Sequence, residues 1–267
     1  NTADDGAEIR LDDGQVMRTG LIVGADGAGS QVRILSGIGC HSESYGQQAV
    51  VATVVAELGN RATAWQRFMA RGPLALLPMQ RDLFSIVWST SPAEADRLCA
   101  MPVAEFNSVL TEASEARLGQ LTLLGDRAGF PLRLQHARPY VKPGLALVGD
   151  AAHVIHPLAG QGVNLGFLDA ASLVDALVIG RDRGRAPGAM RTLRAYERQR
   201  RGHNTATQLA MDGLKHLFSN DSGALSLVRN LGLGAAGRVA PLRRTFERLA
   251  LGDVVDLPTL SRTIPRR

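Results

Sequence analysis

The chain is poor in several residue types, and each shortage excludes a class of protein. Only two cysteines occur among 267 residues, Cys40 and Cys99. They can form neither a disulfide framework nor a cysteine-based metal site, and such sparse cysteine suits a reducing cytosol. Uninterrupted apolar runs are also short: residues 145–148 are typical, whereas a membrane span needs about 18 residues.

Aromatic residues make up 4% of the chain, and Lys142 and Lys215 are the only lysines among 30 basic residues. The net charge of +5 is concentrated in residues 181–203, which hold eight arginines against Asp182 and Glu197. Nucleic-acid binding would need basic residues interleaved with exposed aromatics, and this segment has only Tyr196. We therefore expect no nucleic-acid partner and favour a solvated helix face for this segment.

The remaining composition is that of a folded protein, with 45% hydrophobic and 21% charged residues. Short apolar runs at 21–24 and 145–149 resemble buried strands of a parallel sheet, and Asp13-Gly14 predicts a hairpin turn before the first. Residues 44–134 are β-rich with a helical stretch at 92–118, which predicts an antiparallel sheet. Helices are expected at 163–179, around 206–217, at 225–233 and at 241–251. The expected inward side chains of the middle helical stretch are Leu98, Val103, Phe106, Val109 and Leu110.

Two segments, 21–33 and 145–164, share one design: an apolar strand, an aspartate at its carboxyl end, a glycine-rich turn and a helix start. Ligands of open α/β sheets bind beyond the carboxyl ends of strands, where helix N-termini point. An aspartate there accepts hydrogen bonds from sugar-like hydroxyls, and glycines let the backbone approach a ligand. Each segment alone indicates a polyol- or phosphate-bearing ligand.

Together the two segments resemble a known pair of motifs. Asp26, Gly27, Ser30 and Arg33 match the DG motif of flavin-dependent aromatic hydroxylases. The GD motif of that superfamily is matched by Gly149, Asp150, Ala151, Ala152, His153, Pro157, Gly160, Gln161, Gly162 and Asn164. The chain thus resembles the single-component, group A FAD-dependent monooxygenases. Segments 63–79, 211–220 and 227–244 resemble in particular the ubiquinone-biosynthesis hydroxylase family.

The resemblance implies an α/β fold with a discontinuous FAD-binding parallel-sheet domain of the hydroxybenzoate-hydroxylase type at 1–43 and 135–180. It implies an antiparallel substrate-side sheet at 44–134 and a carboxyl-terminal helical region at 181–267. The family's amino-terminal G-x-G-x-x-G fingerprint does not occur in the sequence. We therefore expect an amino-terminally truncated piece, whose ability to fold and to bind FAD alone stays open.

The resemblance also assigns roles to single residues. Asp150, next to Gly149, would bind the ribityl or diphosphate part of FAD. The backbone of Gly160, Gln161, Gly162 and Asn164 would face the flavin pyrimidine edge, where a helix N-terminus stabilises the negative charge of reduced flavin. Pro157 would lie between flavin and substrate ring, as the catalytic-site residue. Asp26 and Gly27 would sit near the diphosphate, with Arg33 anchoring their turn.

The implied reaction is NAD(P)H-dependent hydroxylation of the aromatic ring of a polyprenyl phenol or benzoquinol with O2, through a flavin C4a-hydroperoxide. The enzyme would be cytoplasmic or peripheral on the inner membrane, where the arginines of 181–203 could attract anionic lipid head groups. Association with a biosynthetic complex is a further expectation. Two alternatives stay open: a hydroxylase of a soluble aromatic compound, and an inactive fragment or paralogue acting as a scaffold.

No metal site is expected. His153 and His156 have a spacing that could hold a metal, but no cysteine or carboxylate cluster completes a site. We expect His153 to be a structural group beside the flavin loop. Trp65 and Phe68 are candidates for a substrate cavity or, more commonly, for core packing.

Overall fold

The computed structural model of the chain describes residues 2–3, 6–69, 71–155, 162–218 and 257–262. Contacts divide the chain into two units. The first, here the α4 unit, comprises residues 1–43, 133–213 and 233–267, and the second, the α2–α3 unit, comprises residues 44–132 and 214–232. The three-part domain organisation expected from the sequence stays a prediction.

The α4 unit begins with a small antiparallel sheet in the order β1-β2-β3, formed by β1 (Thr2–Ala3), β2 (Gly6–Arg10) and β3 (Val16–Thr19). Arg10 pairs with Val16, and the backbone N–H of Leu11 donates to the carbonyl of Gln15. Gly14 in the turn has a φ of +85°, which favours glycine. The predicted hairpin around Asp13-Gly14 is confirmed.

A second sheet in the α4 unit has the order β10-β11-β4, formed by β10 (Val141–Lys142), β11 (Leu145–Leu147) and β4 (Ile22–Gly24). β4 and β11 are parallel, as the sequence predicts, and β11 is fully buried. β4 is less buried than expected, since Val23 is 44% exposed. Within the part of the chain that the structure describes, β4 pairs along only one of its edges, which leaves it partly open.

The longest sheet has the order β12-β9-β5-β8-β7-β6. Its strands are β5 (Gly39–Ala56), β6 (Trp65–Met69), β7 (Gly72–Pro78), β8 (Leu83–Thr90), β9 (Leu121–Arg138) and β12 (His153–Val154). Neighbouring strands from β5 through β8, β7 and β6 run antiparallel, as expected for this region. The full lengths of β5 and β9, 18 residues each, were not predicted, because glycine, proline and charged residues interrupt their apolar pattern.

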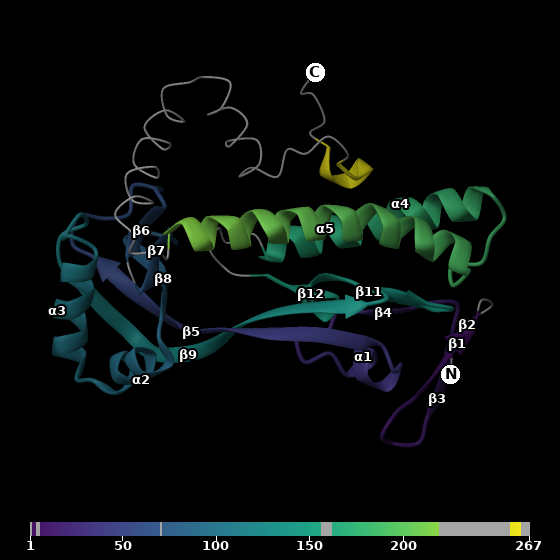
Figure 1. Ribbon diagram of the computed structural model, residues 1–267, viewed down its shortest axis with the longest axis horizontal. Coiled ribbons are helices and arrows are strands. Elements are labelled where there is room, and N and C mark those ends of the chain that lie inside the picture. The colour runs from purple at the N-terminus through teal and green to yellow at the C-terminus, as the bar shows by residue number, and fades with distance from the viewer. Residues whose placement is uncertain (1, 4–5, 70, 156–161, 219–256, 263–267) are drawn as a thin grey trace. The chain divides into compact units, whose positions relative to one another are not determined.

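The helical stretch of the α2–α3 unit is two helices, α2 (Pro92–Ala100) and α3 (Val103–Ala113), which lie together in Figure 1. Pro102 separates them, because proline cannot donate the helix hydrogen bond. Leu98, Phe106 and Leu110 are fully buried against the sheet, as predicted, and Val109 packs partly. Val103 is 51% exposed, so its inward assignment is wrong: as the first residue of α3 it lies at the helix end.

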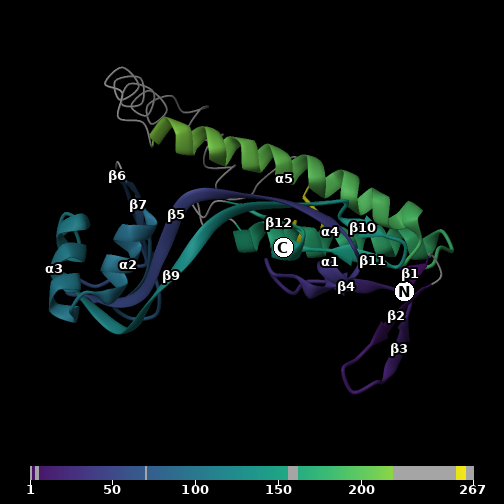
Figure 2. The ribbon, with the colours of Figure 1, turned by 60° about the horizontal axis from the view of Figure 1, so that its bottom comes forward.

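Two long helices, α4 (Gly162–Asp182) and α5 (Met190–Phe218), run side by side in Figures 1 and 2. The expected helix at 163–179 is confirmed, and the arginine-rich segment contains the end of α4, the non-helical residues 183–189 and the start of α5. The helices expected at 225–233 and 241–251 lie outside the described residues.

The length and composition of α4 would also allow it to cross a membrane. A search for uninterrupted apolar runs does not find this helix, because single polar residues interrupt its sequence. Core helices of soluble proteins pass the same test, so this finding assigns no location. The face of α4 that carries Leu165, Leu168 and Leu173 is buried inside the protein.

Candidate cofactor site

The two motif segments meet at one edge of a sheet. β4 and β11 are parallel neighbours, with Gly24 opposite Leu147, so both strands end at the same level. The backbone N–H of Val148 donates to the carbonyl of Gly24 at 2.9 Å. Asp26 follows the end of β4 by two residues and Asp150 follows the end of β11 by three. The structure therefore brings the two predicted aspartate turns together where open α/β sheets bind ligands.

The first turn, here the DG turn (residues 25–30), is held by its own aspartate. The Ser30 hydroxyl donates to one carboxylate oxygen of Asp26, and the Val32 N–H donates to the other at 3.1 Å. Ser30 Oγ also accepts from the Arg33 N–H and caps α1 (Gln31–Leu35). Burial raises the pKa of Asp26, but these hydrogen bonds lower it more, so the carboxyl is ionised at neutral pH.

Arg33 ties the DG turn to the second motif. Its side chain is buried and donates to the carbonyl of Ala28 at 2.7 Å and to the carbonyl of Ala151 at 2.8 Å. One guanidinium thus bridges the two turns with two of its five donors. These contacts fit the anchoring role expected for Arg33, while its contact with a cofactor stays a prediction.

The second turn, here the GD turn, is the short 3-10 helix η1 (Gly149–Ala151). Gly149 has a φ of +58°, which favours glycine, and a Cβ there would lie 3.5 Å from the Cα of Gly166 on α4. α4 thus packs directly on the turn. The side chain of Asp150 is exposed, and among the described residues it has no hydrogen-bond partner. Asp150 is therefore open to a ligand.

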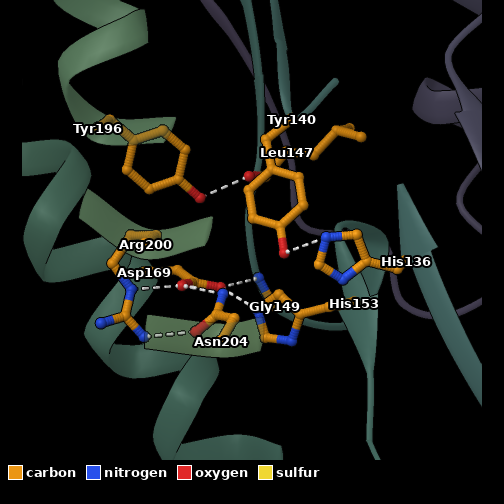
Figure 3. Close-up of polar contacts among 9 residues, drawn as sticks. All are labelled: His136, Tyr140, Leu147, Gly149, His153, Asp169, Tyr196, Arg200 and Asn204. Atoms are coloured by element: carbon orange, nitrogen blue, oxygen red, sulfur yellow. Dashed lines mark hydrogen bonds and ion pairs between the residues drawn. The ribbon is translucent and has the colours of Figure 1, made fainter. Parts of the chain in front are cut away.

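The GD turn is held by a buried polar cluster, here the Asp169 network: Asp169, His153, Arg200 and Asn204 (Figure 3). Asp169 on α4 accepts from the Gly149 N–H at 3.0 Å and lies 2.5 Å from His153 Nε2. From α5, Arg200 donates to Asp169 at 2.7 Å and Asn204 donates at 3.2 Å. All four side chains are at most 3% exposed. The carboxylate of Asp169 thus joins α4, α5 and the turn.

The charges in this cluster are set by burial and pairing. Burial raises the pKa of Asp169, but the hydrogen bond from His153 and the charge of Arg200 lower it more. Nearby, burial lowers the pKa of His136 to about 4, and His136 Nε2 lies 3.4 Å from the Tyr140 hydroxyl. Asp169 is thus ionised at neutral pH and His136 is neutral. His153 is structural, as expected, and His156 lies outside the described residues.

The remaining predicted residues fall at the start of α4. Gly162 and Asn164 lie in its first turn, and the Asn164 side chain is exposed. A Cβ on Gly162 would have no atom within 4 Å, so this first turn is open among the described residues. Pro157, Gly160 and Gln161 lie outside the described residues, and their roles stay predictions.

Sequence reasoning missed the Asp169 network. Asp169 occurs within the apolar sequence of α4 and Arg200 within a run of arginines, so each is easily taken for an ordinary surface charge. One signal was present: a lone aspartate among apolar neighbours, on the helix face that carries Leu165 and Leu173, has to be paired. Its partner on α5 could not be identified without the tertiary structure.

Comparison with known proteins defines the class first. The model of the FAD binding domain family matches residues 5–210, and the chain belongs to this family. Its cofactor is FAD, as the sequence motifs predict.

The similar proteins define the subfamily. The chain is 44% identical over 249 residues to the 3-demethoxyubiquinol 3-hydroxylase of Escherichia coli K12, covering 93% of this chain and 63% of that protein. It is 42% identical over 264 residues to the ubiquinone hydroxylase UbiL of Rhodospirillum rubrum, covering 98% and 62%. The predicted kinship with ubiquinone-biosynthesis hydroxylases is confirmed. The chain spans a little under two thirds of the length of these relatives.

A solved structure supports the fold. PqsL of Pseudomonas aeruginosa, a probable FAD-dependent monooxygenase, matches with a TM-score of 0.68 and 28% identity, over 80% of this chain and 60% of that one. The anhydrotetracycline hydroxylase OxyS of Streptomyces rimosus matches with a TM-score of 0.70 at 23% identity, over 99% and 53%. The expected α/β class, with a parallel sheet and an antiparallel sheet, is confirmed.

The described residues fit FAD chemically. Asp150 offers an exposed carboxylate for ribityl hydroxyls, and α4 offers first-turn N–H groups beside an open Gly162. Gly27 adds an open backbone turn, with a φ of +81° and no atom within 4 Å of a Cβ built on it. Gly27 and Asp150 both lie beyond the carboxyl ends of the adjacent parallel strands β4 and β11. No group of three or more metal-ligating side chains occurs among the described residues.

Proposed function

We propose that the protein is an FAD-dependent monooxygenase that hydroxylates the aromatic ring of a polyprenyl phenol or benzoquinol in ubiquinone biosynthesis, with NAD(P)H and O2 as co-substrates. Its relatives in E. coli and R. rubrum, a 3-demethoxyubiquinol 3-hydroxylase and a ubiquinone hydroxylase, support the substrate class. The observation that carries the proposal is the parallel pairing of β4 and β11, which gathers the DG and GD turns at one sheet edge.

Each turn contributes a different contact in this proposal. Asp150 accepts hydrogen bonds from the ribityl hydroxyls of FAD, because its carboxylate is exposed and available. The backbone of Gly27 lies near the diphosphate, where a side chain would obstruct a close approach. Asp26 acts mainly through the DG turn, because both of its carboxylate oxygens already accept hydrogen bonds.

The first turn of α4 supplies the electrostatics. Gly162 and Asn164 present backbone N–H groups toward the flavin pyrimidine edge, together with Gly160 and Gln161 of the same motif. A helix N-terminus stabilises negative charge by typically 0.3–1 kcal/mol, and more in a partly buried site (roughly 2 kcal/mol). Bound FAD supplies the transfer of electrons from NAD(P)H and the activation of O2. In this proposal Pro157, as the family motif implies, lines the gap between the flavin and the substrate ring.

The antiparallel sheet of the α2–α3 unit is the proposed substrate side. Trp65 and Phe68 on β6 are 39% and 43% exposed, so neither is a core residue. Their accessible ring surfaces fit contact with an apolar aromatic substrate better than core packing. We assign no contact residues to the polyprenyl tail of the substrate.

Peripheral membrane association fits the same proposal, because a polyprenyl substrate dissolves in the membrane. The exposed arginines of residues 181–203 are Arg181, Arg183, Arg191, Arg194 and Arg198. Such a patch attracts anionic lipid head groups by about 1 kcal/mol per basic residue near the surface. Cosedimentation with anionic vesicles, compared with neutral vesicles at the same salt concentration, tests this part.

The central experiment combines flavin absorbance with turnover. Purified protein is expected to be yellow or to become so with added FAD, and a prenylated phenol should stimulate NAD(P)H oxidation and O2 consumption. A product with one added ring oxygen identifies hydroxylation. Protein that stays colourless with excess FAD contradicts the proposal. A protein that hydroxylates only soluble phenols contradicts the substrate class alone.

A further inference from the structure

The Asp169 network has a second property besides its burial: it connects the GD turn to helix α5. Three kinds of donor converge on one carboxylate, namely a backbone N–H, a guanidinium and a carboxamide, and His153 completes the set. Asp169 itself is fully buried, so it cannot touch a cofactor that binds at the exposed Asp150. Its effect on a ligand has to pass through the turn.

The two ends of the GD turn are held differently: Arg33 donates to the Ala151 carbonyl at the far end, and Asp169 accepts from Gly149 where the turn leaves β11. The Gly149 N–H donates to the Asp169 carboxylate, and the Gly149 carbonyl accepts from the Ala152 N–H. The conformation at Gly149, with a φ of +58°, sets the direction in which Asp150 leaves the end of β11. A fixed Gly149 therefore fixes the starting point of the Asp150 side chain.

We propose that Asp169 and Arg200 are positioning residues that hold the GD turn so that Asp150 points toward FAD, and that α5 thereby becomes part of the cofactor site. Arg200 compensates the buried charge of Asp169 at 2.7 Å, and its second contact, to Asn204 at 2.9 Å, fixes the plane of its guanidinium. Preorganised outer contacts of this kind strengthen the direct contacts they support. The inference rests on the proposed binding of FAD at Asp150.

The test variant is Asp169→Asn. The amide keeps the shape of the carboxylate but has only one acceptor oxygen. In the wild type, one carboxylate oxygen accepts from Gly149 and the other accepts from Arg200. The amide cannot accept from both Gly149 and Arg200, and the turn loosens. The matched control is Asp182→Asn, the same substitution at an exposed aspartate of α4 that pairs with Arg181 and lies outside the Asp169 network.

The first readout is hydrogen exchange of backbone amides without any cofactor. In Asp169→Asn, exchange at residues 149–151 should become about tenfold faster or more, while residues 145–147 of β11 stay close to wild type. The control should leave both segments nearly unchanged. Equal exchange at 149–151 in Asp169→Asn, Asp182→Asn and wild type would overturn the inference.

The second readout is FAD affinity by flavin fluorescence. Asp169→Asn should bind FAD about tenfold more weakly or worse, and Asp182→Asn should bind like wild type. Unchanged affinity in Asp169→Asn would also overturn the inference. If wild type itself does not bind FAD, the proposed function fails, and the exchange data still decide whether Asp169 holds the turn.

A conservative variant covers the case in which Asp169→Asn does not fold. Arg200→Lys retains a positive charge beside Asp169 but loses the planar fork, so folding is expected to persist. Arg200→Lys should show faster exchange at 149–151 and weaker FAD binding, both to a smaller extent than Asp169→Asn. Wild-type exchange and affinity in Arg200→Lys would contradict the role of Arg200.

Discussion

The DG turn and the GD turn end neighbouring parallel strands, yet they use their aspartates in opposite ways. Asp26 stabilises its own turn by accepting from Ser30 and Val32, so its carboxylate is largely occupied. Asp150 makes no such bond among the described residues, and a different aspartate, Asp169, stabilises its turn from α4. A turn whose support comes from elsewhere leaves its own aspartate free for a ligand.

The largest expected effect concerns the external support of the GD turn. Replacing Arg200 with methionine leaves the buried Asp169 carboxylate without its charged partner. Breaking a buried ion pair in this way costs about 3–5 kcal/mol. The free energy of unfolding, measured with urea, should fall by this amount. The exposed pair of Arg181 and Asp182 is the control, because Arg181→Met should change stability by less than about 1 kcal/mol. Equal losses would show that the buried pair has no special role.

His136, a buried histidine near the GD turn, is expected to make stability depend on pH. Burial lowers the pKa of His136 to about 4, from 6.5. Because the folded-state pKa is lower than the unfolded one, the folded state binds fewer protons between these values. Stability should be full above pH 6.5 and should fall by at most about 1.4 kcal/mol per pH unit down to pH 4.

The check for this pH effect is the melting temperature of His136→Gln against pH. Glutamine can still meet the Tyr140 hydroxyl but does not titrate. The variant should lose part of the slope between pH 6.5 and 4. A slope identical to that of wild type would contradict the assignment to His136.

The ligand role of the GD turn predicts a change in affinity without a change in stability. Asp150→Ala should weaken FAD binding by about 1.5–3 kcal/mol, because a charge-assisted hydrogen bond is lost. Its unfolding free energy should stay within about 0.5 kcal/mol of wild type, as for other exposed positions. Fluorescence titration and urea unfolding measure the two quantities. A large loss of stability would mean that Asp150 supports the fold instead.

The smallest effect belongs to the DG turn and has the reverse pattern. Asp26→Ala removes two hydrogen bonds that support the Ser30 cap and the first turn of α1, and should cost about 0.5–2 kcal/mol of stability, the range for losing a helix cap. Its loss of FAD affinity should be smaller than that of Asp150→Ala. If Asp26→Ala weakens FAD more than Asp150→Ala does, the contrast between the two turns is wrong.

The same contrast shows what the sequence can predict. The hairpin, the parallel pairing of β4 and β11 and the helix after the GD turn follow from local patterns: Asp13-Gly14, short apolar runs and glycine before a helical period. The separation of α2 from α3 was missed, although Pro102 marks it. The Asp169 network was also missed, because it joins residues 149, 169 and 200, and spacing along the chain does not report such a contact.

The candidate site residues also differ in how far the sequence predicts them. Asp26, Arg33 and Asp150 could be placed from motifs, since a motif encodes a strand end and a turn. Which of the two aspartates is free could not be foreseen, because it depends on hydrogen bonds made only in the folded state.

Hydrogen exchange with and without FAD tests the central claim, that FAD binds where β4 and β11 end. We predict that saturating FAD slows exchange at residues 148–152 and 162–166 and leaves residues 92–113 of α2 and α3 unchanged. Bound FAD that leaves 148–152 unprotected, or that protects only the α2–α3 unit, would contradict the account.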